Sequence, residues 1–317
     1  MERVAYGGWP NCVRLSNGVL ELVATTDVGP RLIRFGLLGG SNVFREWPEQ
    51  LGKTGGEGFR IYGGHRLWHG PEDPQRTYVA DNQPVQWNWH EGTLRLTAPT
   101  ETLTGLQKEM EIVMDPSRAR VTVRHRLINR GLKPVTTMPW SISVMPGPGR
   151  AIVPQEPYVA HAERLLPART MTLWAYTDMR DPRYTWGTKY VQIACDPGVN
   201  RAQKIGFMNT VGWAAYAGGG TLFVKRFGYD ARALYADLGC NVEVYTGGDM
   251  LELETMGRLA PLAPGATAEH VEVWHLFPAT LDGDDNLLET KLLPLIRPTE
   301  PPQDPPTSVP AGASRGP

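Results

Sequence analysis

The stretch "VEVYTGGDMLELETMGRLAPLAPGATAEHVEVW", residues 242–274, decides the fold expected for this chain. Apolar and polar residues alternate on both sides of Gly247-Gly248, which is the pattern of two strands joined by a tight turn. Because successive strand residues point to opposite faces, Glu252 and Glu254 share one face and the leucines beside them occupy the other. Pairing of the two strands would bring a third carboxylate, Glu243, to the same face. The stretch therefore predicts antiparallel strands that gather carboxylates on one face.

Short strands separated by turn residues are predicted over most of the chain. The 317 residues include 35 glycines and 28 prolines, which fall between short apolar runs, and this spacing favours strands over helices. Asn17-Gly18 and Glu91-Gly92 each separate two alternating runs and predict hairpins. Only residues 284–296 have helical spacing. The pattern predicts an all-β, mostly antiparallel sandwich with one short C-terminal helix. Further strands are predicted at residues 31–38, 106–115, 118–129, 188–194, 204–209, 212–216, 221–227, 241–246, 250–255 and 268–276.

Composition and charge limit the kind of protein. A formal net charge of −1 gives no basic surface for nucleic acid or an anionic membrane, and no apolar run approaches the roughly 20 residues that cross a bilayer. The first residues lack the apolar core of a secretory signal, and the three cysteines form no disulfide or zinc pattern. We expect one domain over residues 1–297, a disordered proline-rich tail over 298–317, and a cytoplasmic location, with the oligomeric state left open.

A second stretch, "RIYGGHRLWHGPE" at residues 60–72, gathers histidine, arginine and tryptophan between turn formers. Its glycines and proline predict a loop. The histidine spacing completes no ligand set, so we expect no metal site. An arginine fork, an apolar indole face and a histidine that titrates near neutrality suit a sugar, whose hydroxyls need donors and acceptors. A structural role, with the tryptophan in the core and the histidines bonded to backbone, is the alternative.

Isolated basic residues are weaker candidates. Lys189 and Lys225 lie in or beside predicted strands, where long side chains usually extend outward to solvent. Lys189 nevertheless remains a candidate for contact with a ligand. His125 has no partner pattern and is expected to be structural, and His270 flanks the last strand, where pairing with a carboxylate has no support in the sequence.

Both ends of the chain resemble the galactose mutarotase (aldose 1-epimerase) superfamily. "VYTG", "LELET" and "LAPGATAEHVEVW" are similar to the last strands of the family, and "LSNGVLELVATTDVGPRLIRFGLLGGSNVF" at residues 15–44 is similar to its opening hairpin. The likeness is greatest to an uncharacterised bacterial branch. The resemblance implies a galactose-mutarotase-like β-supersandwich over residues 1–280, a carbohydrate as the small-molecule partner, and no cofactor. It also implies that Glu254 is the general base and that Tyr245 is an aromatic residue of the sugar pocket.

The sequence departs from the family at the general acid. Mutarotases carry a His-Pro-aromatic stretch midway along the chain, whereas this chain reads Met138-Pro139-Trp140, and methionine cannot donate a proton. The His-Gly-Gly loop of the family is reordered here as Gly63-Gly64-His65. The best candidate for the acid is therefore His65, with Glu254 as the base. The residues expected to contact the sugar are Arg66, Trp68, His69, Glu72, Trp140, Lys189, Glu243 and Tyr245.

Three functions are compatible with the sequence. The first is a carbohydrate isomerase of aldose 1-epimerase type, in which Glu254 takes a proton from a sugar hydroxyl and His65 protonates the ring oxygen. The second is a sugar-binding protein that kept the pocket and lost the reaction, which Met138 would explain. The third is a lyase or hydrolase with a different acid–base pair. The assignment of the acid and base requires His65 and Glu254 to line one sugar-sized hollow.

Overall fold

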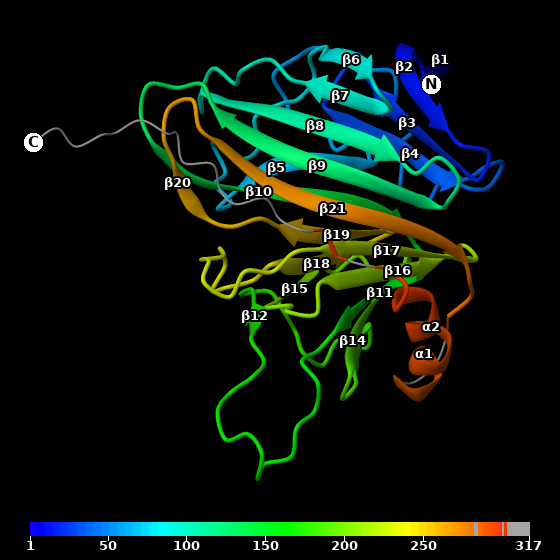
Figure 1. Cartoon of the computed structure of the whole chain (residues 1–317), viewed down its shortest axis with the longest axis vertical. Coiled ribbons are helices and arrows are strands. Elements are labelled where there is room, and N and C mark those ends of the chain that lie inside the picture. The colour runs from blue at the N-terminus through cyan, green and yellow to red at the C-terminus, as the bar shows by residue number, and fades with distance from the viewer. Residues whose placement is uncertain (282–284, 300, 303–317) are drawn as a thin grey trace, which may run out of the picture.

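The strands form two large antiparallel sheets that pack face to face (Figure 1). The computed structural model describes residues 1–281, 285–299 and 301–302. Strand order in the first sheet is β1 (Glu2–Tyr6), β2 (Trp9–Ser16), β3 (Leu20–Thr25), β4 (Arg31–Leu37), β5 (His65–Gly70), β10 (Val135–Pro146), β19 (Met250–Met256), β18 (Val242–Gly247), β15 (Gln203–Phe207) and β12 (Met171–Leu173), with β20 (Ala260–Leu262) beside β10. The order in the second sheet is β13 (Tyr184–Trp186), β14 (Tyr190–Cys195), β11 (Gly149–Pro154), β16 (Trp213–Gly218), β17 (Thr221–Phe227), β21 (Thr267–Pro278), β9 (Arg120–Asn129), β8 (Leu106–Met114), β7 (Thr93–Thr97) and β6 (Gln86–His90).

The predicted hairpins and strands are confirmed. At the first hairpin, between β2 and β3, the Asn17 side-chain oxygen accepts hydrogen bonds from the backbone N–H groups of Val19 and Leu20 at 2.9 and 2.8 Å. At the second, between β6 and β7, Glu91 and Gly92 both have positive φ, as a tight two-residue turn requires. Each predicted strand range overlaps an observed strand. Short runs between turn residues therefore located most of the strands.

Aromatic rings fill the space between the two sheets. Trp274 of β21 lies at their centre, with ring centroids 5.5 Å from Phe35 of β4 and 5.6 Å from Phe223 of β17. The three side chains are buried and belong to one continuous apolar core that draws on both sheets. This close-packed core covers the inner face of the first sheet. Polar groups can therefore gather on the outer face of that sheet.

The expectation of a loop at residues 60–72 is wrong, because β5 lies in the middle of the first sheet, between β4 and β10. Gly63 and Gly64 have φ of 106° and 75° and immediately precede this strand. A Cβ at Gly63 would lie 2.0 Å from the Arg45 carbonyl oxygen, and one at Gly64 would lie 2.4 Å from that of Leu32. These glycines therefore allow a close backbone approach at the start of the strand.

The C-terminal region contains two short helices, α1 (Asp285–Lys291) and α2 (Leu293–Ile296), where one helix was expected over residues 284–296. Pro294 lies in the first turn of α2, and because proline lacks a backbone N–H it begins a new helix more readily than it continues one. Thr299, inside the expected tail, is buried and accepts a hydrogen bond from Arg226 Nε at 2.8 Å. Residues 284, 300 and 303–317 of the two predicted segments lie outside the described residues.

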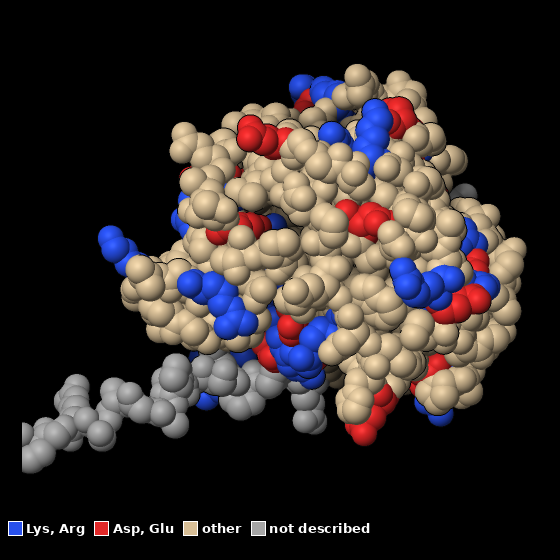
Figure 2. Space-filling model, turned by 90° about the horizontal axis from the view of Figure 1, so that it is seen from above, with Lys and Arg blue, Asp and Glu red and all other residues tan. Residues whose placement is uncertain are grey.

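The outer surface carries charges of both signs. Seen from above, acidic and basic side chains lie in small mixed groups on a largely uncharged face (Figure 2). Within the part of the chain that the structure describes, no helix is long and apolar enough to span a bilayer.

Candidate functional site

Strand register brings the predicted carboxylates together. β18 and β19 pair so that Glu243 lies directly opposite Glu254, and Tyr245 lies opposite Glu252. Opposed residues of paired strands point to the same face. The residues between them, such as Leu253, belong to the core between the sheets, so the four polar side chains point outward from the first sheet. The predicted convergence of three carboxylates on one face is confirmed, and the Tyr245 phenol lies on the same face.

A lysine from the next strand completes this arrangement. Lys204 of β15 lies opposite Tyr245, and its Nζ is 2.7 Å from a Glu243 carboxylate oxygen and 3.3 Å from Glu254 Oε2. Trp140 of β10 donates its indole N–H to the same Glu254 oxygen at 2.8 Å. We call Lys204, Glu243, Glu254 and Trp140 the Lys204 cluster. Sequence reasoning missed Lys204, although the alternation in "QKIGF" places it on the face opposite to Ile205.

Burial and charge give the two carboxyl groups unusual proton affinity. Burial raises the pKa of Glu254, and Glu252 adds to the effect, while Lys204 and Trp140 oppose it. Burial also raises the pKa of Glu243 well above its usual range, helped by the charge of Glu254. Burial alone would lower the pKa of Lys204, but Glu254 and Glu243 outweigh it and raise that pKa. The lysine is therefore an ammonium, and Glu243 holds its proton more tightly than an ordinary carboxyl does.

Arg66 adds unpaired donors to the same face. Arg66 of β5 and Glu254 of β19 both lie opposite Ile142 of β10, so they share a face. The guanidinium donates to Glu252 at 2.9 Å and lies 4.4 Å from the ring centroid of Trp68. Its Nε and Nη1 are buried without a hydrogen-bond partner, and so are Oε1 of Glu254 and Oε1 of Glu243. Hydroxyl groups, which donate and accept, are the natural complement of such a set.

Aromatic side chains border the polar groups. Trp68 has ring centroids 5.6 Å from Trp140, 4.9 Å from Tyr78 and 5.4 Å from Phe59. Tyr78 is exposed and donates its hydroxyl to Glu72 at 2.6 Å, which places Glu72 at the solvent-exposed edge, or rim, of this group of side chains. These rings offer an apolar contact surface beside the polar groups.

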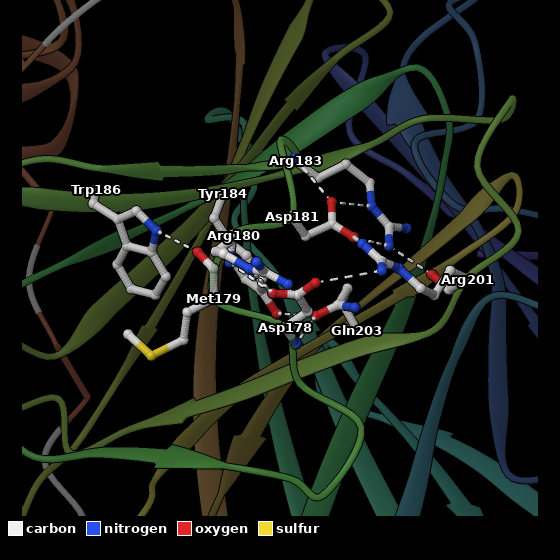
Figure 3. Close-up of polar contacts among 9 residues, drawn as sticks. All are labelled: Asp178, Met179, Arg180, Asp181, Arg183, Tyr184, Trp186, Arg201 and Gln203. Carbon is white, nitrogen blue, oxygen red and sulfur yellow. Dashed lines mark hydrogen bonds and ion pairs between the residues drawn. The ribbon is translucent and has the colours of Figure 1, made fainter.

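A salt-bridge network anchors another aromatic segment beside Lys204. Asp181 is buried between Arg183 and Arg201, with contacts of 2.9 and 2.7 Å (Figure 3). The hydrogen bond from Arg183 is the main reason that the pKa of Asp181 is lowered. This network lies next to Gln203, which accepts a hydrogen bond from the Asp178 backbone at 2.9 Å. The segment that precedes the network carries Trp174 and Tyr176, and the Trp174 ring centroid is 4.8 Å from Lys204 Nζ.

The prediction that His65 and Glu254 line one hollow is wrong. Arg66 points to the outer face, so His65, its neighbour along the strand, points into the space between the sheets. There its Nδ1 lies 2.8 Å from Ser143 Oγ and its Nε2 lies 2.7 Å from His125 Nε2. The side chain is fully buried, and burial lowers its pKa well below the usual value. His65 therefore lies on the far face of the sheet from Glu254 and has no path to a ligand bound there.

Two other predicted contact residues also lie away from the Lys204 cluster. His69 shares the inner face with His65 and lies 3.1 Å from the Arg76 carbonyl oxygen and 3.6 Å from the Glu101 carboxylate. Lys189 precedes β14 of the second sheet and forms an ion pair with Glu289 of α1. Arg66, Trp68, Trp140, Glu243, Tyr245 and Glu254 are the predicted residues that the fold brings to one face, with Glu72 at its rim.

A buried ion pair lies directly behind Glu254. Lys225 of β17 and Glu272 of β21 are both fully buried, with 2.9 Å between their charged atoms. The expectation that Lys225 extends to solvent is wrong, because it also donates to the Leu253 carbonyl oxygen at 3.0 Å. Burial raises the pKa of Glu272, but Lys225 outweighs it and the pKa lies well below its usual range. Glu272 accepts further hydrogen bonds from Ser141, Thr255 and Trp274.

The histidines beside this ion pair form a hydrogen-bonded chain. The ligand atoms of His65, His125 and Glu272 lie within 4.8 Å of one another, a grouping that the sequence did not indicate. His125 Nδ1 donates to the His270 carbonyl oxygen at 3.2 Å, so its Nε2 accepts the proton of His65 Nε2. Ser143 then donates to His65 Nδ1. Every ring nitrogen of the two histidines is thus paired without a metal, and the expectation of no metal site stays a prediction.

These neutral histidines predict a loss of stability in mild acid. Burial lowers the pKa of His125 to about 4, against an ordinary value near 6.5. The contribution of His125 to the free energy of unfolding is therefore complete above pH 6.5. It is lost as the pH falls toward 4, because in this range only the unfolded chain gains the proton. Urea unfolding should show that His125→Gln reduces this pH-dependent loss by about 3 kcal/mol. Equal pH slopes for variant and wild type would contradict the assignment.

Comparison with known proteins places the fold. No protein-family model matches the chain, and no curated protein matches it by sequence. A galactose mutarotase-like protein from Lactobacillus casei ATCC 334 matches with a TM-score of 0.55 at 8% identity, over 84% of this chain and 100% of that one. A galactose mutarotase related enzyme from Lactobacillus acidophilus gives 0.54 at 8% identity, over 85% and 98%. A galactose mutarotase-like protein from Clostridium acetobutylicum gives 0.51 at 9% identity, over 87% and 98%. The chain therefore has the galactose mutarotase-like fold, as its sequence resemblance implied.

Proposed function

We propose that the Lys204 cluster interconverts the two anomers of a monosaccharide, as an aldose 1-epimerase does. The supporting observation is the pairing of Glu243 with Glu254 across β18 and β19. Both side chains are buried, both contact Lys204, and each has an oxygen without a hydrogen-bond partner. Two neighbouring carboxyl groups that share one ammonium ion supply a proton donor and a proton acceptor in one place.

The reaction follows from which carboxyl holds the proton. Glu254, which Lys204 and Trp140 contact on one oxygen, is the carboxylate and takes the proton of the anomeric hydroxyl. Glu243, the neutral acid, gives its proton to the ring oxygen as the bond between that oxygen and C1 breaks. The open-chain aldehyde turns about C1–C2, and the reverse proton transfers close the ring as the other anomer. Each transfer contributes about 10²–10⁴-fold to the rate.

The second carboxyl takes the place of the missing imidazole. Met138, at the position where the family resemblance leads one to expect histidine, is fully buried in an apolar cluster with Trp68 and Trp140. Neither Met138 nor His65 can serve the outer face as an acid, whereas Glu243 already lies on it. Glu243 can therefore act as the proton donor without any rearrangement of the fold.

Sugar binding without turnover is the second candidate, and the loss of the family histidine at Met138 favours it. Magnetisation-exchange NMR on a panel of aldoses, combined with calorimetry, separates the two functions. The proposal expects exchange between anomer signals that is faster than the spontaneous rate for at least one sugar. Binding of a sugar with only the spontaneous exchange rate would refute the isomerase and support the binding protein.

Arg66 is expected to act in binding and not in proton transfer. Its unpaired Nε and Nη1 offer donors to sugar hydroxyls, so Arg66→Ala should raise KM by about 10- to 100-fold with little change in kcat. Arg130→Ala is the matched control, since Arg130 is an exposed arginine that bonds Gln107 on the second sheet. A fall in kcat that equals the fall in kcat/KM would contradict a role confined to binding.

A further inference from the structure

The segment between β11 and β12, residues 155–170, is an arm that extends away from both sheets (Figure 1). It contains no strand or helix. Three large apolar side chains on it face solvent, with exposed fractions of 77% for Tyr158, 76% for Leu165 and 78% for Leu166. Exposed apolar groups gathered on one projection are typical of a surface that contacts another protein.

The arm also borders apolar hollows. One, of about 690 Å³, lies where the arm meets the second sheet, and aromatic rings of Tyr158, Tyr190 and Trp213 line it together with Leu293 of α2. Another, of about 380 Å³, lies within the arm itself, and its apolar lining includes Val159, Leu166 and Pro167. Projecting leucines and apolar hollows therefore occur on the same patch.

We propose that the arm is the interface of a homodimer, in which Leu165 and Leu166 of each copy pack into the hollow at the base of the other copy's arm. A two-fold contact uses the same patch on both copies, so the patch must carry both a projection and a hollow. The 16 residues of the arm and the eight other residues around the larger hollow fall within the roughly 20–30 residues that one partner gives to a standard interface.

The charges of the arm favour a second copy over another partner. Glu163 and Arg164 are exposed neighbours of opposite sign that directly precede the two leucines. A two-fold axis that places Glu163 of one copy against Arg164 of the other makes two ion pairs at once. A partner of one charge sign would match only one of these residues.

The base of the arm is already fixed before any partner binds. Arg169 donates to the Glu156 carbonyl oxygen at 2.7 Å, to the Thr188 carbonyl oxygen at 3.0 Å and to the Gln155 side chain at 3.1 Å. These bonds tie both ends of the arm to each other and to the turn before β14. Less conformational freedom is then lost on association, which favours binding.

Sedimentation equilibrium of the full chain over the micromolar range tests the proposal. Wild type should have twice the chain mass, and Leu165→Glu/Leu166→Glu should raise the dissociation constant more than about 100-fold with unchanged circular dichroism. Leu132→Glu, at a position 96% exposed in the turn after β9, is the control and should remain dimeric. A wild type of single-chain mass throughout, or a double variant that still pairs, would overturn the proposal.

Charge reversal tests the two-fold contact itself. Glu163→Arg gives each copy two positive charges at the contact, and Arg164→Glu gives each copy two negative charges, so each variant alone should dissociate about tenfold more readily. An equimolar mixture of the two variants should regain wild-type association, because each copy then meets the opposite sign. Dissociation of the mixture to the same degree as the separate variants would rule out the proposed pairing.

Discussion

Replacing Glu254 with glutamine is expected to lower kcat/KM for anomer exchange by about 10²–10⁴-fold while the fold is retained. Glutamine has the size of glutamate and its oxygen can still accept the Trp140 indole N–H, but it cannot take a proton from the sugar. Magnetisation-exchange NMR measures the rate for each anomer pair, and circular dichroism confirms that the variant is folded.

Glu252→Gln is the matched control for this change. Glu252 lies on the same strand face as Glu254, but its role in the structure is to pair with Arg66. Its substitution should alter KM and, although it removes a charge that raises the pKa of Glu254, should lower kcat far less than Glu254→Gln does. Wild-type kcat/KM in Glu254→Gln, or an equal loss of kcat in both variants, would contradict the assignment of Glu254 as the base.

Replacing Lys225 with methionine is expected to lower the free energy of unfolding by about 3–5 kcal/mol. The change leaves the Glu272 carboxylate in the core between the sheets without its cation, since the two side chains are fully buried and 2.9 Å apart. Methionine fills a similar volume, so packing changes little and the cost is electrostatic. Chemical denaturation followed by tryptophan fluorescence measures the loss.

The double variant Lys225→Met/Glu272→Gln separates charge from packing. Glutamine removes the uncompensated charge and keeps an acceptor for the Trp274 indole N–H, so the double variant should be more stable than Lys225→Met alone. A double variant as unstable as the single one would show that the buried charge is not the cause.

Short runs between turn residues predicted most of the strands, and polarity alternates along some of them. β18 and β19 are of this kind, and their turn and alternation were enough to place Glu243 and Glu254 on one face. β5 lacks this alternation, because polar residues point to both of its faces, which are buried by the core on the inner side and by Phe59 and Tyr78 on the outer side. Because β5 has neither alternation nor an apolar run, the glycines that flank it outweighed the strand signal and misled the prediction.

The direction of a side chain depends on strand assignment, which is why His65 was misplaced. Within a loop, His65 and Arg66 can both reach a ligand, whereas in a strand only one of them can. Lys204 and Lys225 pose the same problem. Each is a single lysine in a short strand, and only the neighbouring strands show that one pairs with Glu243 and the other with Glu272. The family resemblance implied Glu254 as the base, whereas Glu243, the acid that we propose, could be placed opposite it only from the strand register.

A crystal structure of the protein soaked with a hexose tests the central claim, the proposed roles of Glu254 and Glu243, most directly. The account predicts the anomeric hydroxyl within hydrogen-bond distance of the free Glu254 oxygen, with the ring oxygen facing Glu243 and a hydroxyl on Arg66. A sugar bound with its anomeric carbon away from both carboxyl groups, or bound only at another surface, would contradict it.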